Sequence, residues 1–106
     1  MAELITPQRF QESEGLADWQ VGPGAASVRY RTPGFSAGAG FVVEIAAIAD
    51  ELDHHPDVDL RYGSVLVRTT THSSGGLTDR DVALAQRISA LASERGFMPE
   101  AAGDDE

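Results

Sequence analysis

The 106-residue chain contains no cysteine, and this absence removes several chemistries at once. Without a thiol there is no disulfide framework, no thiolate metal site and no cysteine nucleophile. The fold must therefore be held together by an apolar core. A hydrophobic fraction of 42% at this length is enough for one such core and too little for two.

Basic residues and long apolar runs are also scarce. Eight Lys and Arg against 17 Asp and Glu give a formal net charge of −9, a poor basis for binding the phosphates of nucleic acids. No apolar stretch approaches the roughly 20 residues of a membrane span. The first residues also lack the basic and apolar regions of a secretory leader. We therefore expect a cytoplasmic protein that binds neither nucleic acid nor membrane.

The acidic excess is partly concentrated at the C-terminal end, where Gly103-Asp104-Asp105-Glu106 is typical of a solvated segment. Tail acidity says little about the charge of a folded body. We predict a single domain over residues 1–98 and an acidic tail over residues 99–106.

Hydrophobic periodicity predicts the order helix, two strands, helix, two strands, helix. The expected elements are a short helix from Pro7 that ends before Gly15, strands at 19–21 and 27–32, a helix from Phe35 that ends before His55, strands at 58–62 and 65–72, and a helix between Thr78 and Gly96. Two hairpins separated by a helix favour an α+β fold, with three helices packed on one face of a four-stranded antiparallel sheet. Because its edges or open face would need protection, we expect a homo-oligomer.

All three histidines lie at the ends of predicted elements, where side chains can reach a cleft. His54 and His55 follow the central helix, and His72 ends the fourth strand. Because Pro56 keeps His55 extended, the side chains of His54 and His55 should diverge. Histidines in such places can transfer protons near neutral pH. A His-His-Pro sequence alone is more often a polar turn, so the motif by itself leaves both interpretations open.

Asp81 has a structural explanation of its own. Thr78-Asp79-Arg80-Asp81 resembles a capping box with Asp in place of Glu at the third position. Asp79 and Asp81 also suit the positive end of the helix dipole. From these residues alone, both aspartates are structural.

Two other chemistries are weaker alternatives. The three histidines with Asp50 or Asp53 could in principle bind zinc, as in a zinc-dependent hydrolase. Adjacent histidines with diverging side chains are a poor ligand pair for one ion, so we expect no metal. Ser73 and Ser74 follow His72, but no Gly-x-Ser-x-Gly turn indicates a nucleophile.

Taken together, these residues resemble the pterin-4a-carbinolamine dehydratase family. The resemblance rests on Asp50-x3-His54-His55-Pro56, on Tyr62, on His72 and on Gly-Gly-Leu-Thr-Asp-Arg-Asp ending at Asp81. Each piece is weak alone, but the set of spacings is specific. A looser similarity covers most of residues 4–95. The order of helices and strands in that family agrees with the order that periodicity predicts here.

The resemblance implies an enzyme that removes water from 4a-hydroxytetrahydropterin and releases quinonoid dihydropterin. That product is reduced and reused by aromatic amino-acid hydroxylases, so such an enzyme becomes a possible metabolic partner. The resemblance also implies that His54, His55 and His72 are the acid/base residues and that no cofactor is required. It implies a pterin pocket formed by Asp50, Pro56, Thr71, Ser73, Ser74 and Asp81. Our hypothesis is that His54 abstracts the N5 proton while His72 or His55 protonates the departing 4a-hydroxyl.

The main alternative is a non-catalytic module that binds a protein partner or a pterin on the same scaffold. The family includes a transcriptional coactivator and assembly factors. A divergent relative would be expected to lose histidines, and this chain has kept all three, which favours the enzyme. The family includes dimers and tetramers, so we expect a homodimer or a homotetramer.

Overall fold

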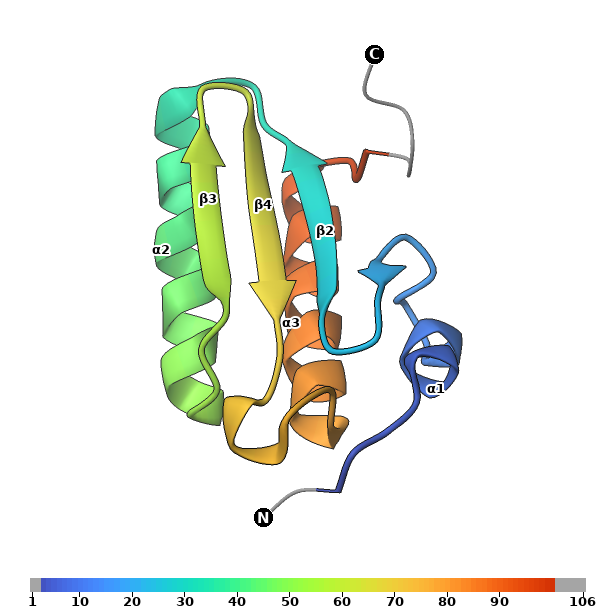
Figure 1. The fold of residues 1–106 in the computed structure, drawn as a ribbon. Coiled ribbons are helices and arrows are strands. Elements are labelled where there is room, and N and C mark those ends of the chain that lie inside the picture. Colours follow the sequence, from blue (N-terminus) through green and yellow to red (C-terminus); the bar gives the residue numbers. More distant parts are fainter. Residues whose placement is uncertain (1–2, 101–106) are drawn as a thin grey trace.

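The computed structural model describes residues 3–100 and contains a four-stranded antiparallel sheet and three helices (Figure 1). In chain order the elements are α1 (Pro7–Glu12), β1 (Gln20–Val21), β2 (Ala26–Arg31), α2 (Phe35–Leu52), β3 (Asp57–Arg61), β4 (Ser64–Thr69), the 3-10 turn η1 (His72–Ser74) and α3 (Asp79–Arg95). This order confirms the predicted α+β fold. Within the described residues, no helix has the length and apolarity needed to cross a membrane.

The strands lie in the order β1-β2-β4-β3, so the two hairpins join through the long pair β2 and β4. That pair runs in register from Ala26 opposite Thr69 to Arg31 opposite Ser64. The long helices α2 and α3 lie side by side behind the sheet, and α1 lies beside β1 (Figure 1). One face of the sheet is therefore covered by helices.

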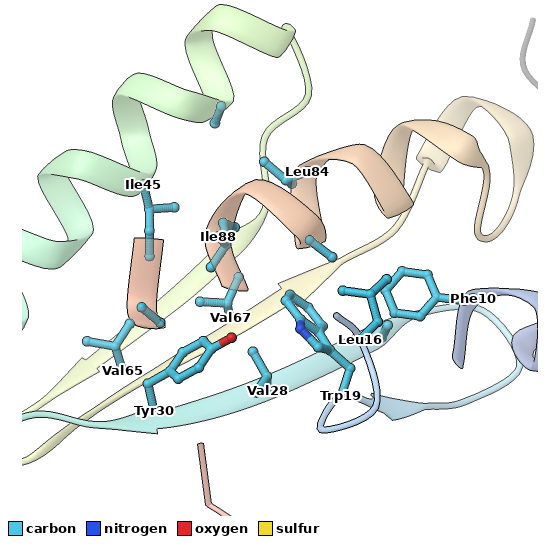
Figure 2. Packing of buried hydrophobic residues seen from close by; sticks show 14 of the residues in the cluster. Phe10, Leu16, Trp19, Val28, Tyr30, Ile45, Val65, Val67, Leu84 and Ile88 are labelled. Atoms are coloured by element: carbon cyan, nitrogen blue, oxygen red, sulfur yellow. The ribbon is translucent and has the colours of Figure 1, made fainter. Parts of the chain in front are cut away.

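One apolar core fills the space between the sheet and the helices (Figure 2). Ile45 from α2 and Ile88 from α3 meet Val65 and Val67 from β4. At the other end of this core, Phe10 of α1 packs edge-on against Trp19 with ring centroids 5.9 Å apart. The short N-terminal helix is thus attached through the same core.

Helix α2 comes unusually close to the sheet at Gly38. A Cβ atom at this position would lie only 2.8 Å from Cδ1 of Leu60 and 3.3 Å from Oγ1 of Thr32. Glycine inside a helix costs about 1 kcal/mol relative to alanine. At Gly38 the absence of a side chain allows the helix to lie close to the sheet. Around Gly40 there is open space, so no such contact requires a glycine there.

The fourth strand is shorter than the sequence predicts. Alternation continues to His72, but β4 ends at Thr69, because its partner β2 begins at Ala26, opposite Thr69. Beyond that point Thr71 pairs with Gly76 inside the loop, and Gly75 adopts a left-handed conformation with φ of 80°. The prediction that His72 ends a strand is therefore wrong: the residue begins η1.

The chain after α3 returns to the sheet. Pro99 forms an isolated β-bridge with Tyr30. The N–H of Arg31 donates to the carbonyl of Met98 at 2.9 Å, and the N–H of Glu100 donates to the carbonyl of Arg29 at 2.8 Å. The predicted tail starts at residue 99, so its first two residues are paired with β2. Residues 101–106 of that tail lie outside the described residues.

Candidate active site

The predicted site residues come from several segments at one end of the sheet. The end of α2, the η1 turn and the start of α3 lie next to one another there (Figure 1). These segments and the turn before β3 hold Asp50, His54, His55, Pro56, Thr71, His72, Ser73, Ser74 and Asp81. The fold thus brings a set of residues that spans 50 to 81 in the sequence to one place.

Helix α2 ends in a left-handed turn at Asp53, directly before the two adjacent histidines. Asp53 has φ of 53°, and the next residue, His54, donates its N–H to the carbonyl of Ala49 at 3.0 Å. This pattern is a Schellman-type helix end. His54 points inward and is 8% exposed, whereas the side chain of His55 points outward and is 57% exposed. The predicted divergence of the two side chains is confirmed.

Asp81 is the centre of the buried part of the site. Its side chain is fully buried in the first turn of α3. Oδ1 accepts hydrogen bonds from Oγ1 of Thr69 at 2.5 Å and from Nε2 of His54 at 2.7 Å. Oδ2 accepts from Oγ1 of Thr71 at 2.6 Å and from the N–H of Thr78 at 2.9 Å. A carboxylate has about four acceptor positions, so Asp81 is saturated.

The predicted capping box is present, and it has a second role. The Asp81 side chain caps the N–H of Thr78, as the sequence indicates, and the same carboxylate binds the imidazole of His54. Burial alone would raise the pKa of the Asp81 carboxyl. The hydrogen bonds from Thr69, Thr71, His54 and the Thr78 backbone outweigh that effect and hold the pKa below its usual range. Asp81 is therefore an anion inside the protein.

The hydrogen-bond network fixes which nitrogen of His54 carries a proton. An ionised Asp81 can only accept, so Nε2 must donate to it. Thr71 gives its one hydroxyl hydrogen to Asp81 as well, so its oxygen can only accept from Nε2, which lies 3.3 Å away. Both neighbours require an Nε2–H. In the neutral ring, Nδ1 then carries the lone pair.

Nδ1 is also the ring nitrogen that solvent can reach. Within residues 3–100, no hydrogen bond to Nδ1 is present. Every buried side-chain N or O atom in this range has a hydrogen-bond partner, so Nδ1, which has none, must be accessible to solvent. His54 borders a cavity of about 290 Å³. The other lining residues of this cavity are Leu52, Asp79, Arg80 and Ala83. A buried anion thus holds a histidine whose free nitrogen is available at the surface.

His55 forms a second, looser pair with Asp50. Its Nε2 lies 2.8 Å from Oδ1 of Asp50, one helical turn back on α2. The Asp50 side chain is 75% exposed, so water screens the pair. This contact orients His55 without removing it from solvent.

The remaining predicted residues lie around these two pairs. His72 and Ser73 are exposed in η1, directly after the buried Thr71. Ser74 ends that turn and donates its N–H to the carbonyl of Thr71 at 3.0 Å. Pro56 is half-buried between His55 and β3. Among residues 3–100, no group of three or more His, Cys, Asp and Glu side chains is arranged to hold a metal ion.

Three residues of the site are not predicted from the sequence. Thr69 and Thr78 surround Asp81, and Arg80 borders the cavity and donates to the carbonyl of Asp53 at 2.6 Å. The alternation of β4 could have indicated that Thr69 points inward. No local pattern indicates that its hydroxyl would meet a carboxylate 12 residues away.

Fold and site together define a class of protein: a small α+β domain that presents carboxylate-held histidines at one end of its sheet. Such an arrangement can accept and donate protons without a covalent intermediate.

The chain belongs to the pterin-4a-carbinolamine dehydratase family. The model of this family, described as "Pterin 4 alpha carbinolamine dehydratase", matches residues 3–91. A protein of Streptomyces coelicolor is 39% identical over 97 residues, which cover 90% of this chain and 96% of the relative. A protein of Chloroflexus aggregans is 41% identical over 92 residues, covering 86% of this chain and 98% of the relative. Both carry the name "Putative pterin-4-alpha-carbinolamine dehydratase".

Solved structures agree with this assignment. The crystal structure of a transcriptional coactivator/pterin dehydratase from Brucella melitensis matches with a TM-score of 0.74 and 32% identity, covering 85% of this chain and 99% of that one. A pterin dehydratase-like protein identified as a RuBisCO assembly factor in the alpha-carboxysome matches with a TM-score of 0.57 and 23% identity, covering 70% of this chain and 86% of that one. The second match shows a shared fold alone.

Proposed function

We propose that this protein is a dehydratase that converts 4a-hydroxytetrahydropterin into quinonoid dihydropterin and water by histidine acid/base catalysis. The observation that carries the proposal is the buried Asp81 carboxylate bonded to Nε2 of His54 at 2.7 Å. That bond leaves Nδ1 free to accept a proton, and His54 is among the residues that line a cavity. The family assignment supplies the substrate class.

The reaction needs one base and one acid. Nδ1 of His54 takes the proton from N5 of the substrate, and the N5 electron pair forms the N5–C4a double bond. The C4a–O bond breaks, and a protonated His72 or His55 gives its proton to the departing hydroxyl, which leaves as water. Proton transfers of this kind typically contribute on the order of 10² to 10⁴-fold each.

The buried anion has a defined part in this mechanism. When His54 gains a proton its ring becomes positive, and the Asp81 carboxylate at 2.7 Å stabilises that charge. We propose that Asp81 and Thr71, which are 0% and 3% exposed, act through His54 and do not contact the pterin. The pterin would instead meet the more accessible residues of the predicted site, namely Asp50, Pro56, Ser73 and Ser74.

The decisive experiment follows the decay of 4a-hydroxytetrahydropterin in a stopped-flow instrument by its ultraviolet absorbance. The wild type is compared with a His55→Ala, His72→Ala double variant, because both side chains are exposed and their loss leaves the Asp81 network intact. Gln20→Ala, an exposed change on β1, is the control. We expect acceleration by wild type and control, and its loss in the double variant.

A wild-type protein that is folded and yet leaves the decay at its uncatalysed rate would contradict the proposal. That result would favour the alternative function, a non-catalytic module that binds a protein partner or a pterin. Circular dichroism on the same samples establishes that each variant is folded.

The cellular setting is part of the proposal. We propose a cytoplasmic enzyme that supplies an aromatic amino-acid hydroxylase with recyclable pterin and that forms a homodimer or homotetramer. Phe35 and Val43 on α2 are 52% and 68% exposed, which suits an oligomer contact. Sedimentation measures the oligomer directly, and a monomer at micromolar concentration would contradict this part.

A further inference from the structure

Two adjacent residues at the start of α3, Arg80 and Asp81, bind the segment that ends α2. Asp81 points inward and binds the ring of His54. Arg80 points outward, and its Nη2 donates to the backbone carbonyl of Asp53 at 2.6 Å. Neighbouring residues of one helical turn therefore make two different contacts: Arg80 binds the backbone of Asp53, and Asp81 binds the ring of His54.

Arg80 acts on a backbone conformation that has an energetic cost. Asp53 is the one residue other than glycine with positive φ among residues 3–100. The left-handed region costs an L-residue roughly 1–2 kcal/mol, and aspartate is among the residues that tolerate it best. This single turn directly precedes His54 and His55 and sets the direction in which the chain leaves α2.

The peptide group between Asp53 and His54 is held at both ends. Its carbonyl accepts from Arg80 at 2.6 Å, and its N–H donates to the carbonyl of Ala49 at 3.0 Å. A rotation of this peptide would break both bonds and would redirect the two side chains that follow. Bonds to opposite ends of a peptide fix its plane more tightly than either bond alone.

We propose that Arg80 is a positioning residue: by holding the Asp53 carbonyl it keeps the left-handed turn that sends His54 to Asp81 and His55 to Asp50. The inference rests on the proposed function, because it concerns the same histidines. Arg80 acts through the turn, and its effect on turnover arises from the placement of His54 and His55.

The chain offers a matched control on the same helix. Arg87 of α3 also reaches back to α2, where its Nη2 lies 2.5 Å from the Glu51 carboxylate. Its side chain is 47% exposed, so it too is a surface arginine. It contacts a side chain and leaves the turn untouched. Any general effect of removing an arginine between these two helices should appear in both variants.

Arg80 also borders the cavity next to His54, so a direct contact with the substrate is the competing explanation. The two explanations differ in what a second change does. Glycine adopts the left-handed conformation without cost. If Arg80 holds the turn, Asp53→Gly should restore activity to an Arg80→Gln protein. If Arg80 binds the pterin, glycine at residue 53 cannot replace it.

The experiment measures kcat and KM for pterin dehydration in the wild type, Arg80→Gln, Arg87→Gln, Asp53→Gly, Asp53→Asn and the double variant Arg80→Gln, Asp53→Gly. We expect Arg80→Gln to lower kcat about threefold to tenfold with little change in KM. Arg87→Gln should match the wild type. Asp53→Gly should restore most of the lost kcat, and Asp53→Asn shows whether loss of the carboxylate alone changes the rate.

Two results would overturn the inference while leaving the dehydratase intact. One is an Arg80→Gln enzyme with wild-type kcat. The other is a raised KM in Arg80→Gln that Asp53→Gly does not reverse, which would make Arg80 a substrate contact. Failure of the proposed function itself looks different, because the wild type would then show no activity at all.

Discussion

The two adjacent histidines form pairs that look alike and differ in their surroundings. The inner pair, His54 with Asp81, has an N–O distance of 2.7 Å, and the outer pair, His55 with Asp50, has one of 2.8 Å. The carboxylate of the inner pair is fully buried, and that of the outer pair is 75% exposed. Distance therefore does not decide what each pair contributes.

Burial decides it instead. In the inner pair, removing either partner leaves a polar group inside the protein without its hydrogen bond, which costs more than the pair itself contributes. In the outer pair, water replaces whichever partner is lost, and such exposed pairs contribute about 0–1 kcal/mol. We therefore expect the inner pair to support both folding and catalysis, and the outer pair to support catalysis alone.

The largest effect should follow from Asp81→Asn. The amide cannot accept four hydrogen bonds, and its NH₂ group would face donors. We expect a loss of about 2–4 kcal/mol in the free energy of unfolding, measured by urea denaturation, together with a loss of dehydratase activity. The control is Asp79→Asn, two residues away, where an exposed carboxylate pairs with Arg9 at 3.0 Å. Its effect should stay within about 1 kcal/mol. Equal losses in both variants would refute the special role of burial.

Removing each histidine separates the two pairs directly. His54→Ala should destabilise the protein by about 2–3 kcal/mol, because Asp81 loses a hydrogen bond and the ring leaves a gap. His55→Ala should cost less than about 0.5 kcal/mol. Both changes should lower kcat by on the order of 10²-fold or more. Matching unfolding curves for the two variants would contradict the comparison.

The inner pair also predicts how stability depends on pH. The pKa of Asp81 lies below its usual value of about 3.9, so the unfolded chain binds this proton more readily than the folded one. The stability that results is complete above the unfolded pKa and is lost as pH falls through the folded one. Below about pH 4, the free energy of unfolding should fall more steeply in the wild type than in Asp81→Asn. Parallel curves would contradict an ionised Asp81 in the folded state.

The smallest effect should follow from Asp50→Asn, which removes the charge of the outer pair. We expect a change of less than about 0.5 kcal/mol in the free energy of unfolding. The rate should fall only a few-fold, because His55 keeps its place in the turn and loses only an orienting partner. Steady-state kinetics at low and high salt test this prediction. A salt-independent loss as large as that of His55→Ala would show that the pair acts as a unit.

The sequence predicts the fold well because the pattern of each element is local. Apolar spacing in α2 and α3 and alternation in the strands depend on neighbouring residues, and the order of elements follows from them. The end of β4 was predicted incorrectly, since the alternation runs on to His72 while the pairing partner stops at Ala26. Where a strand ends depends on another strand, which alternation does not reveal.

For the same reason, only those features of the site that depend on neighbouring residues can be predicted from the sequence. Pro56 is enough to predict that His54 and His55 diverge, because its effect is confined to the preceding residue. Which histidine is buried could not be predicted, since it depends on Asp81, 27 residues further on. The second role of Asp81 and the parts played by Thr69 and Arg80 likewise arise from contacts between distant segments. Their local patterns show only a cap, a strand residue and a surface arginine.

The Asp81 network has a consequence for the order of events in folding. Its donors come from β4, from the turn after α2 and from the loop before α3, so no single stretch of chain contains the site. Contacts between such distant segments form only when the chain has closed its loops. In a refolding experiment, we therefore expect the proposed dehydratase activity to return only once α3 has docked onto α2 and the sheet. The recovery of activity would then report when the tertiary structure is complete, whereas circular dichroism would report the formation of the helices.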